Sequence, residues 1–385
     1  MLFMYLDQTS RIISTYSADV FGVCSALFEL GGMTIMHDAS GCNSTYTTHD
    51  EPRWYDMDSM VYISGLSEME AILGDDEKLI GDIVSSAEDL KPKFIAIAGT
   101  PIPAMTGFDF QAVAQVVEER TGIPAFGFPT TGMGSYVRGA SMALCAVARR
   151  FLNRDVRKTP DKTVNILGLT PLDFSVNGSD HAIAAFLEGE GYRVLSRWAM
   201  GSSLEELAQA GGAHVNLVVS AAGMGAAKVM RELFGIPFVA GVPVGGFREE
   251  IAKALHRAVQ TGENQYPCAN GTGADIVLIG EGITSVSLAS ALELATGRGT
   301  RVHCPVETEG YPLREKDRAV SSEAEIEEQI RDTRIVVADP LYRPICPEGA
   351  TFVPLPAEAF SGRIWREEIP ELVSGFDEFV RKVII

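Results

Sequence analysis

Short apolar runs recur along the whole chain and are separated by segments of helix length. The runs are rich in valine, isoleucine and alanine, which is typical of strands buried on both faces of a parallel sheet. The segments between them have helical periodicity. The twelve runs are MTIMH, MVYIS, KFIAIAG and IPAFGF; VNILGL, YRVLS, VNLVVS and PFVAGV; and DIVLIG, RVHCP, RIVVAD and TFVPL.

This alternation predicts an α/β protein with three Rossmann-like, doubly wound domains, each built on a roughly four-stranded parallel sheet. The polar segment NRDVRKTPDKT after Phe151 and the Gly-, Asn- and Pro-rich segment TGENQYPCANGTG look like linkers. A cleft where three such domains meet is a favoured place for a ligand. The predicted domains cover residues 1–157, 158–262 and 263–385.

Several helix starts are also indicated by the sequence. An additional helix at about residues 18–30 is expected before the first strand, and it carries Cys24. Ser202 with Glu205, and Ser322 with Glu325, fit the spacing of capping boxes.

Composition and charge argue against a nucleic-acid-binding, secreted or membrane protein. The 385 residues carry a net charge of -19, which argues against binding of nucleic-acid phosphates by clustered Lys and Arg. The N-terminus lacks the pattern of a signal peptide, and no run reaches the length of a membrane span, so we expect a cytoplasmic protein. In a reducing compartment the six cysteines are expected to be free thiols rather than disulfides.

The segment HDASGCNSTYTTHDEPRW, residues 37–54, concentrates reactive side chains directly after the first strand. Its histidines and acids near a cysteine suit proton delivery or binding of a polar substrate. Part of it has a plain structural alternative, in which Thr48 and Glu51 form a capping box and Pro52 lies in the first turn of a helix.

The cysteines divide into three groups. Cys145 on a presumed helix and Cys304 in a presumed strand fit core packing, and Cys268 and Cys346 lie in turn-like contexts. Cys24 and Cys42 flank the first strand and could approach each other at one end of the sheet. Thiolates are the ligands that iron–sulfur clusters require, but two thiolates do not complete a [4Fe-4S] site. A symmetric dimer could supply two more.

Glycine-rich turns follow several strands, as in GTPIPAMTG, GMGSYVRG and GEGITS. Each could place an anion at a helix N-terminus. The chain has no P-loop and no dinucleotide fingerprint in the proper register, so sharp turns of an α/β fold explain these glycines better than nucleotide binding.

Taken together, these segments resemble component 1 of nitrogenase and its relatives, which include the dark-operative protochlorophyllide reductases and the nickel-tetrapyrrole reductive cyclase. HDASGC is similar to the family's His-Gly-Pro-x-Gly-Cys, and MVYISGLSEMEAILGDDEKL, KPKFIAIAGT, NLVVS, FGIPFVAGVPVG and FSGRIW follow in the family's order. The resemblance implies three Rossmann-like domains, a dimeric core and a cluster at the subunit interface. It also implies reduction by a separate ATP-hydrolysing partner that resembles nitrogenase iron protein.

The resemblance also assigns individual residues. Cys24 and Cys42 match the first two cluster cysteines of the family, and Pro101 takes the place of the third. It therefore implies a [4Fe-4S] cluster shared two and two across a homodimer, or across a heterodimer with a paralogue. Ser220 replaces the cysteine that anchors the cofactor in nitrogenase, and Pro356 is nearest to the position of the cofactor's histidine. Dinitrogen reduction in the nitrogenase manner is therefore not expected.

The resulting hypothesis is a reductase subunit that accepts electrons through this cluster and reduces a substrate, such as a tetrapyrrole-like molecule, in the interdomain cleft. A scaffold for assembly of a metal cluster is the first alternative, and a cluster-free small-molecule binding protein is the second. The expected roles are a proton donor or cluster support for His37, reserve ligands for Asp38 and Ser40, and substrate contacts or proton donors for His49, Asp50, Glu51 and Arg53.

Overall fold

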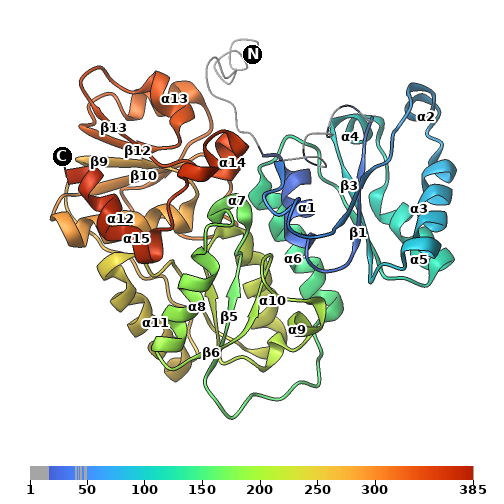
Figure 1. Cartoon of the computed structure of the whole chain (residues 1–385), viewed down its shortest axis with the longest axis horizontal. Coiled ribbons are helices and arrows are strands. Elements are labelled where there is room, and N and C mark those ends of the chain that lie inside the picture. The colour runs from blue at the N-terminus through green and yellow to red at the C-terminus, as the bar shows by residue number, and fades with distance from the viewer. Residues whose placement is uncertain (1–16, 40, 42, 44–45, 47–49, 385) are drawn as a thin grey trace.

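Three parallel β-sheets, each covered by helices, make up the computed structural model of the chain (Figure 1). The structure describes residues 17–39, 41, 43, 46 and 50–384. All strand pairs in the three sheets are parallel, and the strand order in each sheet requires crossover connections through helices. The predicted fold class is therefore confirmed.

The first sheet has the order β2-β1-β3-β4. All five residues of its inner strands β1 and β3 are buried, as expected for strands covered on both faces. Its strands are β1 (Met33–His37), β2 (Met60–Ile63), β3 (Ile95–Gly99) and β4 (Ala125–Phe128). Its helices are α1 (Asp19–Leu27), α2 (Glu68–Leu73), α3 (Asp76–Leu90), α4 (Pro101–Thr106), α5 (Phe110–Thr121) and α6 (Tyr136–Phe151).

The second sheet has the order β6-β5-β7-β8. Its strands are β5 (Thr163–Leu167), β6 (Arg193–Arg197), β7 (Val215–Val218) and β8 (Phe238–Ala240). Its helices are α7 (Pro171–Phe174), α8 (Ser179–Gly189), α9 (Leu204–Ala208), α10 (Met224–Phe234) and α11 (Arg248–Thr261), with 3-10 turns η2 (Ala210–Gly212), η3 (Ala221–Gly223) and η4 (Gly245–Phe247).

The third sheet has the order β11-β10-β9-β12-β13, one strand more than the pattern predicted. Its strands are β9 (Ile276–Ile279), β10 (Thr300–Cys304), β11 (Arg318–Ala319), β12 (Ile335–Ala338) and β13 (Thr351–Pro354). Its helices are α12 (Gly282–Thr296), α13 (Glu323–Gln329), α14 (Glu358–Ser361) and α15 (Leu372–Ile384), with 3-10 segments η5 (Pro340–Ile345) and η6 (Gly362–Glu368).

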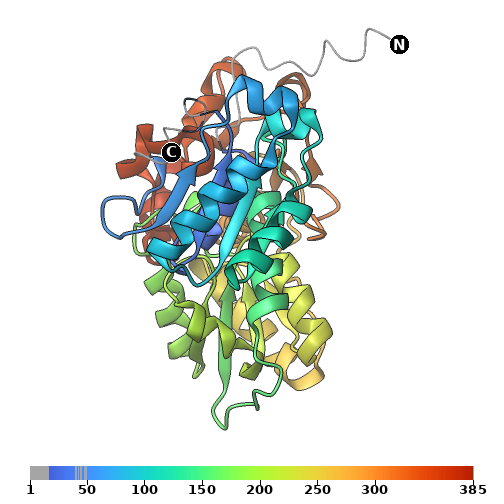
Figure 2. The ribbon, with the colours of Figure 1, turned by 90° about the vertical axis from the view of Figure 1, so that its right-hand side faces the viewer.

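Helix α6 joins the first two units, because it packs against α1 on one side and α10 on the other. The contact with α1 brings backbone close to backbone. A Cβ added to Gly22 would lie 2.0 Å from Tyr136 O, and one added to Gly139 would lie 1.7 Å from Asp19 O. The C-terminal helix α15 returns from the third unit to pack against α8 of the second. The side view shows α1 and the first sheet stacked above the second unit (Figure 2).

Most predicted elements are found, with small corrections. The expected helix at about 18–30 is α1, and the two predicted linkers contain no helix or extended strand apart from Thr163, which begins β5, and Thr261, which ends α11. The first capping box is formed one residue later than predicted, by Ser203 with Glu206. Ser322 does cap α13, but the Glu325 carboxylate accepts from the amide of Ser321 instead of that of Ser322, so the box is not reciprocal. No helix of the described part of the chain is long and apolar enough to cross a membrane.

Candidate functional site

The segment after β1 lies at the carboxyl end of the first sheet, where parallel sheets place binding sites. His37 is the last residue of β1, and its Nδ1 lies 2.9 Å from Ser64 Oγ. Its ring packs against Phe108 with centroids 4.4 Å apart. Burial lowers the pKa of His37 to about 4. At neutral pH the imidazole is therefore uncharged, which suits a positioning role better than that of a cationic acid.

The other predicted residues of this segment are placed as follows. Asp38 is buried and accepts a 2.6 Å hydrogen bond from Asn43 Nδ2. Asp50 is buried, and its carbonyl accepts from Arg366 Nη2 at 2.9 Å. Pro101 is the exposed first residue of α4. Ser40, Cys42 and His49 lie outside the described residues, so their predicted roles stay predictions.

Glu51 and Arg53 are buried and direct their polar atoms at protein partners. Arg53 Nε donates to Glu51 Oε1 at 2.6 Å, and Arg53 Nη1 donates to Glu29 Oε1 at 2.8 Å. Residues 51–57 form turns and bends, so Pro52 does not lie in the first turn of a helix, and that part of the alternative is wrong. Thr48 lies outside the described residues, so its predicted capping box with Glu51 stays a prediction. The predicted substrate contacts of Glu51 and Arg53 stay predictions, and the geometry supports the different role argued below.

Cys24 lies in the middle of α1 and is fully buried. Burial, with a smaller contribution from the Glu51 carboxylate, raises the pKa of the Cys24 thiol well above its usual range. Tyr46, four residues after Cys42 in the sequence, stacks on Phe21 with centroids 5.0 Å apart, so it packs on α1 within one turn of Cys24. A thiol donor in this position fits an iron–sulfur cluster by its chemistry. Among the described residues no group of three or more His, Cys, Asp and Glu side chains is arranged to hold a metal ion.

The remaining cysteines have ordinary surroundings. Cys304 is buried in β10 and Cys145 is partly buried on α6, as their predicted core packing requires. Cys268 lies in the second linker, and Cys346 follows η5.

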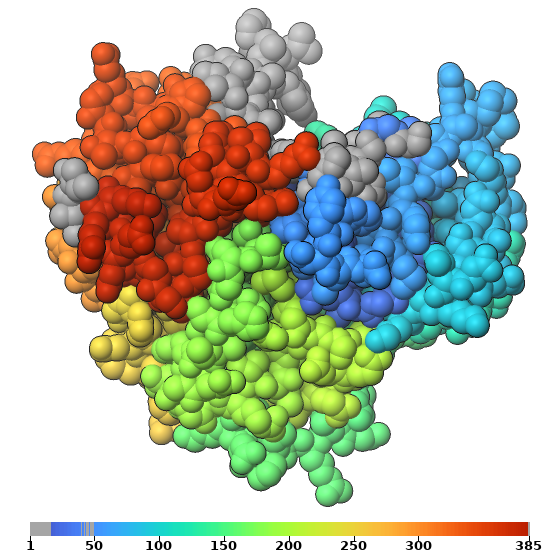
Figure 3. Space-filling view, viewed as in Figure 1, coloured from blue at the N-terminus to red at the C-terminus, as the bar shows by residue number. Residues whose placement is uncertain are grey.

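A second site, missed in the sequence, lies where the three units meet. A cavity of about 80 Å³ is lined by Tyr136 from the first unit, Asp173 from the second, and Glu281 and Asp339 from the third. In the space-filling view the three coloured lobes converge around the green segment that includes α7 (Figure 3). Pro356 also lines this cavity. By the resemblance, Pro356 is nearest to the position of the histidine that holds the cofactor in nitrogenase.

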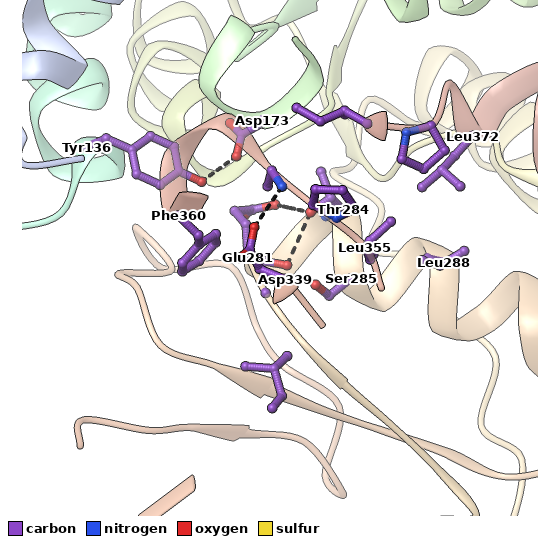
Figure 4. Close-up of a pocket in the computed structure, with 16 residues that line it drawn as sticks. Tyr136, Asp173, Glu281, Thr284, Ser285, Leu288, Asp339, Leu355, Phe360 and Leu372 are labelled. Carbon is purple, nitrogen blue, oxygen red and sulfur yellow. Dashed lines mark hydrogen bonds between the residues drawn. The ribbon is translucent and has the colours of Figure 1, made fainter. Parts of the chain in front are cut away.

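The acids of the cavity are held by neutral hydrogen-bond donors. Tyr136 Oη donates to Asp173 Oδ1, and Thr170 Oγ1 donates to Asp173 Oδ2 at 2.8 Å. Glu281 caps α12 and accepts from the amides of Ala221 and Ile283 at 2.9 and 3.0 Å. In the close-up, Tyr136 points to Asp173, and Glu281 points to Thr284 beside them (Figure 4). No lysine or arginine is among the described residues that line the cavity.

This arrangement favours the protonated form of a carboxyl group. Burial and the nearby Glu281 carboxylate raise the pKa of Asp173 to about 7, and hydrogen bonds from Tyr136 and Thr170 offset only part of the shift. Burial also raises the pKa of Glu281. An acid with a pKa near neutrality can release and recover a proton at working pH. The cavity can therefore supply a proton to a bound molecule.

The sequence did contain a signal for these acids. Asp173 follows β5, Glu281 follows β9 and Asp339 follows β12, each at the carboxyl end of a parallel strand. The local pattern marks Glu281 only as part of the glycine-rich turn GEGITS.

Fold and cavity define a three-unit α/β protein with its candidate ligand site between the units. The family model of nitrogenase component 1 type oxidoreductases matches residues 20–265. The chain belongs to this family, and the resemblance seen in the sequence is confirmed. A solved structure, "Nitrogenase Cp1 at pH 6.5", superposes with a TM-score of 0.70 over 98% of this chain and 93% of that chain, at 16% identity. At this identity the likeness shows the fold alone.

Curated relatives match shorter stretches. The nitrogenase iron-molybdenum cofactor biosynthesis protein NifE of Clostridium pasteurianum is 27% identical over 46% of this chain and 38% of its own length. The nitrogenase molybdenum-iron protein alpha chain of Azospirillum brasilense is 28% identical over 47% of this chain and 39% of its own. One component of the light-independent protochlorophyllide reductase of Prosthecochloris aestuarii is 34% identical over 23% of this chain and 16% of its own. The matches thus span well under half of each relative's length.

Proposed function

We propose that the protein is a nitrogenase-like reductase subunit that accepts electrons from an ATP-hydrolysing iron–sulfur partner and reduces a substrate held between its three units. The observation that carries this proposal is the buried acid at the cavity, because reduction of a bound molecule consumes protons as well as electrons. Family membership supports the oxidoreductase class.

Cys24 and Cys42 are the residues that would hold a [4Fe-4S] cluster, two from each chain of a homodimer. Such a cluster, when bound, would supply electrons one at a time. The chain's own contribution is a dry site: Cys24 is fully buried, and His37 and Asp38 at the end of β1 are buried in the same unit. Metal binding would displace the proton that burial holds on the Cys24 thiol.

An exposed apolar surface supports the dimer. Helices α2 and α4 pack together, and both present large apolar side chains to solvent. These form the α2–α4 face: Met69 63%, Ile72 70%, Leu73 70%, Ile102 38% and Met105 87% exposed. Contiguous exposed apolar residues mark interaction sites. Thr100, directly before α4, donates from Oγ1 to His37 O at 3.0 Å, so this face adjoins the end of β1, where the predicted cluster segment begins.

Asp173 would deliver one proton to the substrate and become a carboxylate. Tyr136 and Thr170 hold both carboxylate oxygens in place during this change. The charge left on Asp173 is opposed by Glu281, which favours recovery of a proton from solvent. Each two-electron reduction thus takes two electrons from the donor and two protons, one of them from Asp173.

The size of the cavity bears on the substrate. Pockets for drug-sized ligands have volumes of about 300–1,000 Å³. The cavity, at about 80 Å³, holds a small molecule as it stands. A tetrapyrrole would require the three units to move apart, so we propose a small substrate first.

The dimer and the cluster can be tested together by size-exclusion chromatography with light scattering under anaerobic conditions. We expect wild-type protein reconstituted with ferrous iron and sulfide to be a dimer with about four iron and four sulfide per dimer. The double variant Ile72→Glu/Met105→Glu should be monomeric and should lose the iron. Leu90→Glu, also at an exposed apolar position but on α3, is the matched control and should behave as wild type. A monomeric wild type without iron would overturn the proposal.

A scaffold for cofactor assembly is favoured by one observation: several of the curated relatives are NifE proteins, which are named for iron-molybdenum cofactor biosynthesis. The two functions differ in the fate of bound iron. Reconstitution with labelled iron, followed by incubation with an apo ferredoxin, would show transfer of the label for a scaffold. A reductase should retain the label through repeated reduction and oxidation.

A further inference from the structure

Arg53 is the centre of a buried charged network, defined here as Arg53 with Glu51 and Glu29. The exposed fractions of these side chains are 5%, 0% and 11%. Arg53 spans the two carboxylates through Nε and Nη1, and its guanidinium lies 4.7 Å from the centre of the Phe28 ring. The planar fork of arginine suits this double pairing, which a lysine does not reproduce.

The Arg53 network ties together three segments that are distant in sequence. Arg53 Nη2 donates to Ser25 O of α1, and Arg53 Nη1 donates to Ala199 O of the second unit, both at 2.8 Å. Glu29 Oε2 in turn accepts from the amide of Gly201 at 2.6 Å. Ala199 has φ +85°, a strained conformation for a residue other than glycine. Its carbonyl is held in place by the arginine.

The same network lies beside Cys24. Ser25 is the next residue in α1, and the Glu51 carboxylate adds to the effect of burial in raising the pKa of the Cys24 thiol. Tyr46 connects the two, because its hydroxyl donates to Glu51 Oε2 at 2.9 Å while its ring stacks on Phe21 of α1. One arginine faces two carboxylates, so the network has a net negative charge in a dry environment.

We propose that the Arg53 network positions the second unit against the Cys24 helix and, through the charge of Glu51, sets the reduction potential of the metal cluster at Cys24. The inference rests on the proposed function. Net charge and burial near a cluster are recognised determinants of its potential. A fixed negative charge opposes the addition of an electron, and the low polarity of the site preserves this effect. The negative charge of Glu51 therefore lowers the reduction potential of the cluster, and the positive charge of Arg53 partly offsets this effect.

The test is a redox titration of reconstituted full-length protein, followed by electron paramagnetic resonance. Glu51→Gln keeps the shape of the side chain and one of its two accepting oxygens but removes a negative charge, so its midpoint potential should be more positive than that of wild type. Glu29→Gln should shift the potential in the same direction by less, because Glu29 pairs with Arg53 Nη1, whereas Glu51 also accepts from Tyr46, which packs on the Cys24 helix. Arg53→Lys keeps the charge, so its potential should stay near wild type while its thermal midpoint falls. Glu77→Gln is the control, because Glu77 pairs with Arg120 on an exposed surface of the same unit.

Two results would overturn the inference. One is a full complement of iron in Glu51→Gln and Glu29→Gln with the wild-type potential in both. The other is a shift in Arg53→Lys as large as that in Glu51→Gln. If wild-type protein binds no iron at all, the proposed function fails instead, and the thermal midpoints of Arg53→Lys and Glu77→Gln still test the positioning part.

Discussion

The Arg53 network and the interdomain cavity both bury carboxyl groups, but they treat the charge in opposite ways. In the network an arginine compensates two carboxylates at 2.6 and 2.8 Å. In the cavity, Asp173 and Glu281 receive hydrogen bonds from hydroxyl groups and backbone amides, and no described cationic side chain lines the space. A paired cation favours the charged form of a buried carboxyl group, whereas burial without a cation favours its protonated form. The first region is therefore a fixed charge and the second a titratable one.

Buried carboxyl groups can therefore have two different roles, which the residue type alone does not distinguish. A fixed charge tunes and positions, and it should be insensitive to pH near neutrality. A titratable acid next to a cavity exchanges protons with a ligand. The predictions below test whether the two regions differ in this way.

The largest effect is expected from Arg53→Met. Removal of the guanidinium leaves Glu51 buried without its cation, and breaking a buried pair in this way costs about 3–5 kcal/mol. Urea denaturation should show this loss in the free energy of unfolding. Arg120→Met removes an exposed partner of Glu77 and is the matched control, for which no clear change is expected. Equal losses in both variants would contradict the special status of the buried network.

Asp173→Asn, unlike Arg53→Met, should become more stable relative to wild type as the pH rises. The pKa of Asp173 lies near 7, above its ordinary value, so the folded state holds a proton that the unfolded state has lost. Wild-type stability from this group is present at low pH and is lost as pH rises through about 7. The asparagine variant should therefore gain on wild type by about 2–4 kcal/mol between pH 4 and pH 8. A constant difference across this range would show that Asp173 is ionised throughout.

His303 should have a smaller effect on the free energy of unfolding, and here the stability falls as the pH falls. It is fully buried in β10, neither ring nitrogen has a hydrogen-bond partner in the described structure, and burial lowers its pKa to about 4. The unfolded state takes up a proton between pH 6.5 and 4 while the folded state does not, so stability falls as pH falls through this window. His303→Phe should remove about 1–3 kcal/mol of this acid sensitivity in thermal unfolding at pH 5. An unchanged pH profile would contradict it.

More of the fold than of the candidate site could be predicted from the sequence. All twelve predicted strands are present in the structure. A short run rich in valine and isoleucine indicates a strand buried on both faces, and this pattern can be recognised without knowing any distant contact. The two-residue strand β11 was too short to leave such a pattern. The capping box moved from Ser202 to Ser203 because adjacent serines offer the same local signal.

The site depended on contacts that no local pattern records. Arg53 finds Glu29 24 residues away and Ala199 146 residues away, so its partners could not be inferred from the segment in which it lies. The acids of the cavity come from two units, Asp173 from the second and Glu281 and Asp339 from the third, and only their shared place after a strand indicated that they would meet. The pairing of Cys24 with Cys42 came from spacing and resemblance and stays a prediction.

The most direct test of the central claim is the Mössbauer spectrum of protein reconstituted with ⁵⁷Fe under anaerobic conditions, measured for wild type and for cysteine variants. We expect the signal of one [4Fe-4S] cluster per two chains in wild type and in Cys346→Ala, and its loss in Cys24→Ala and Cys42→Ala. A cluster that persists when both Cys24 and Cys42 are replaced would contradict the account.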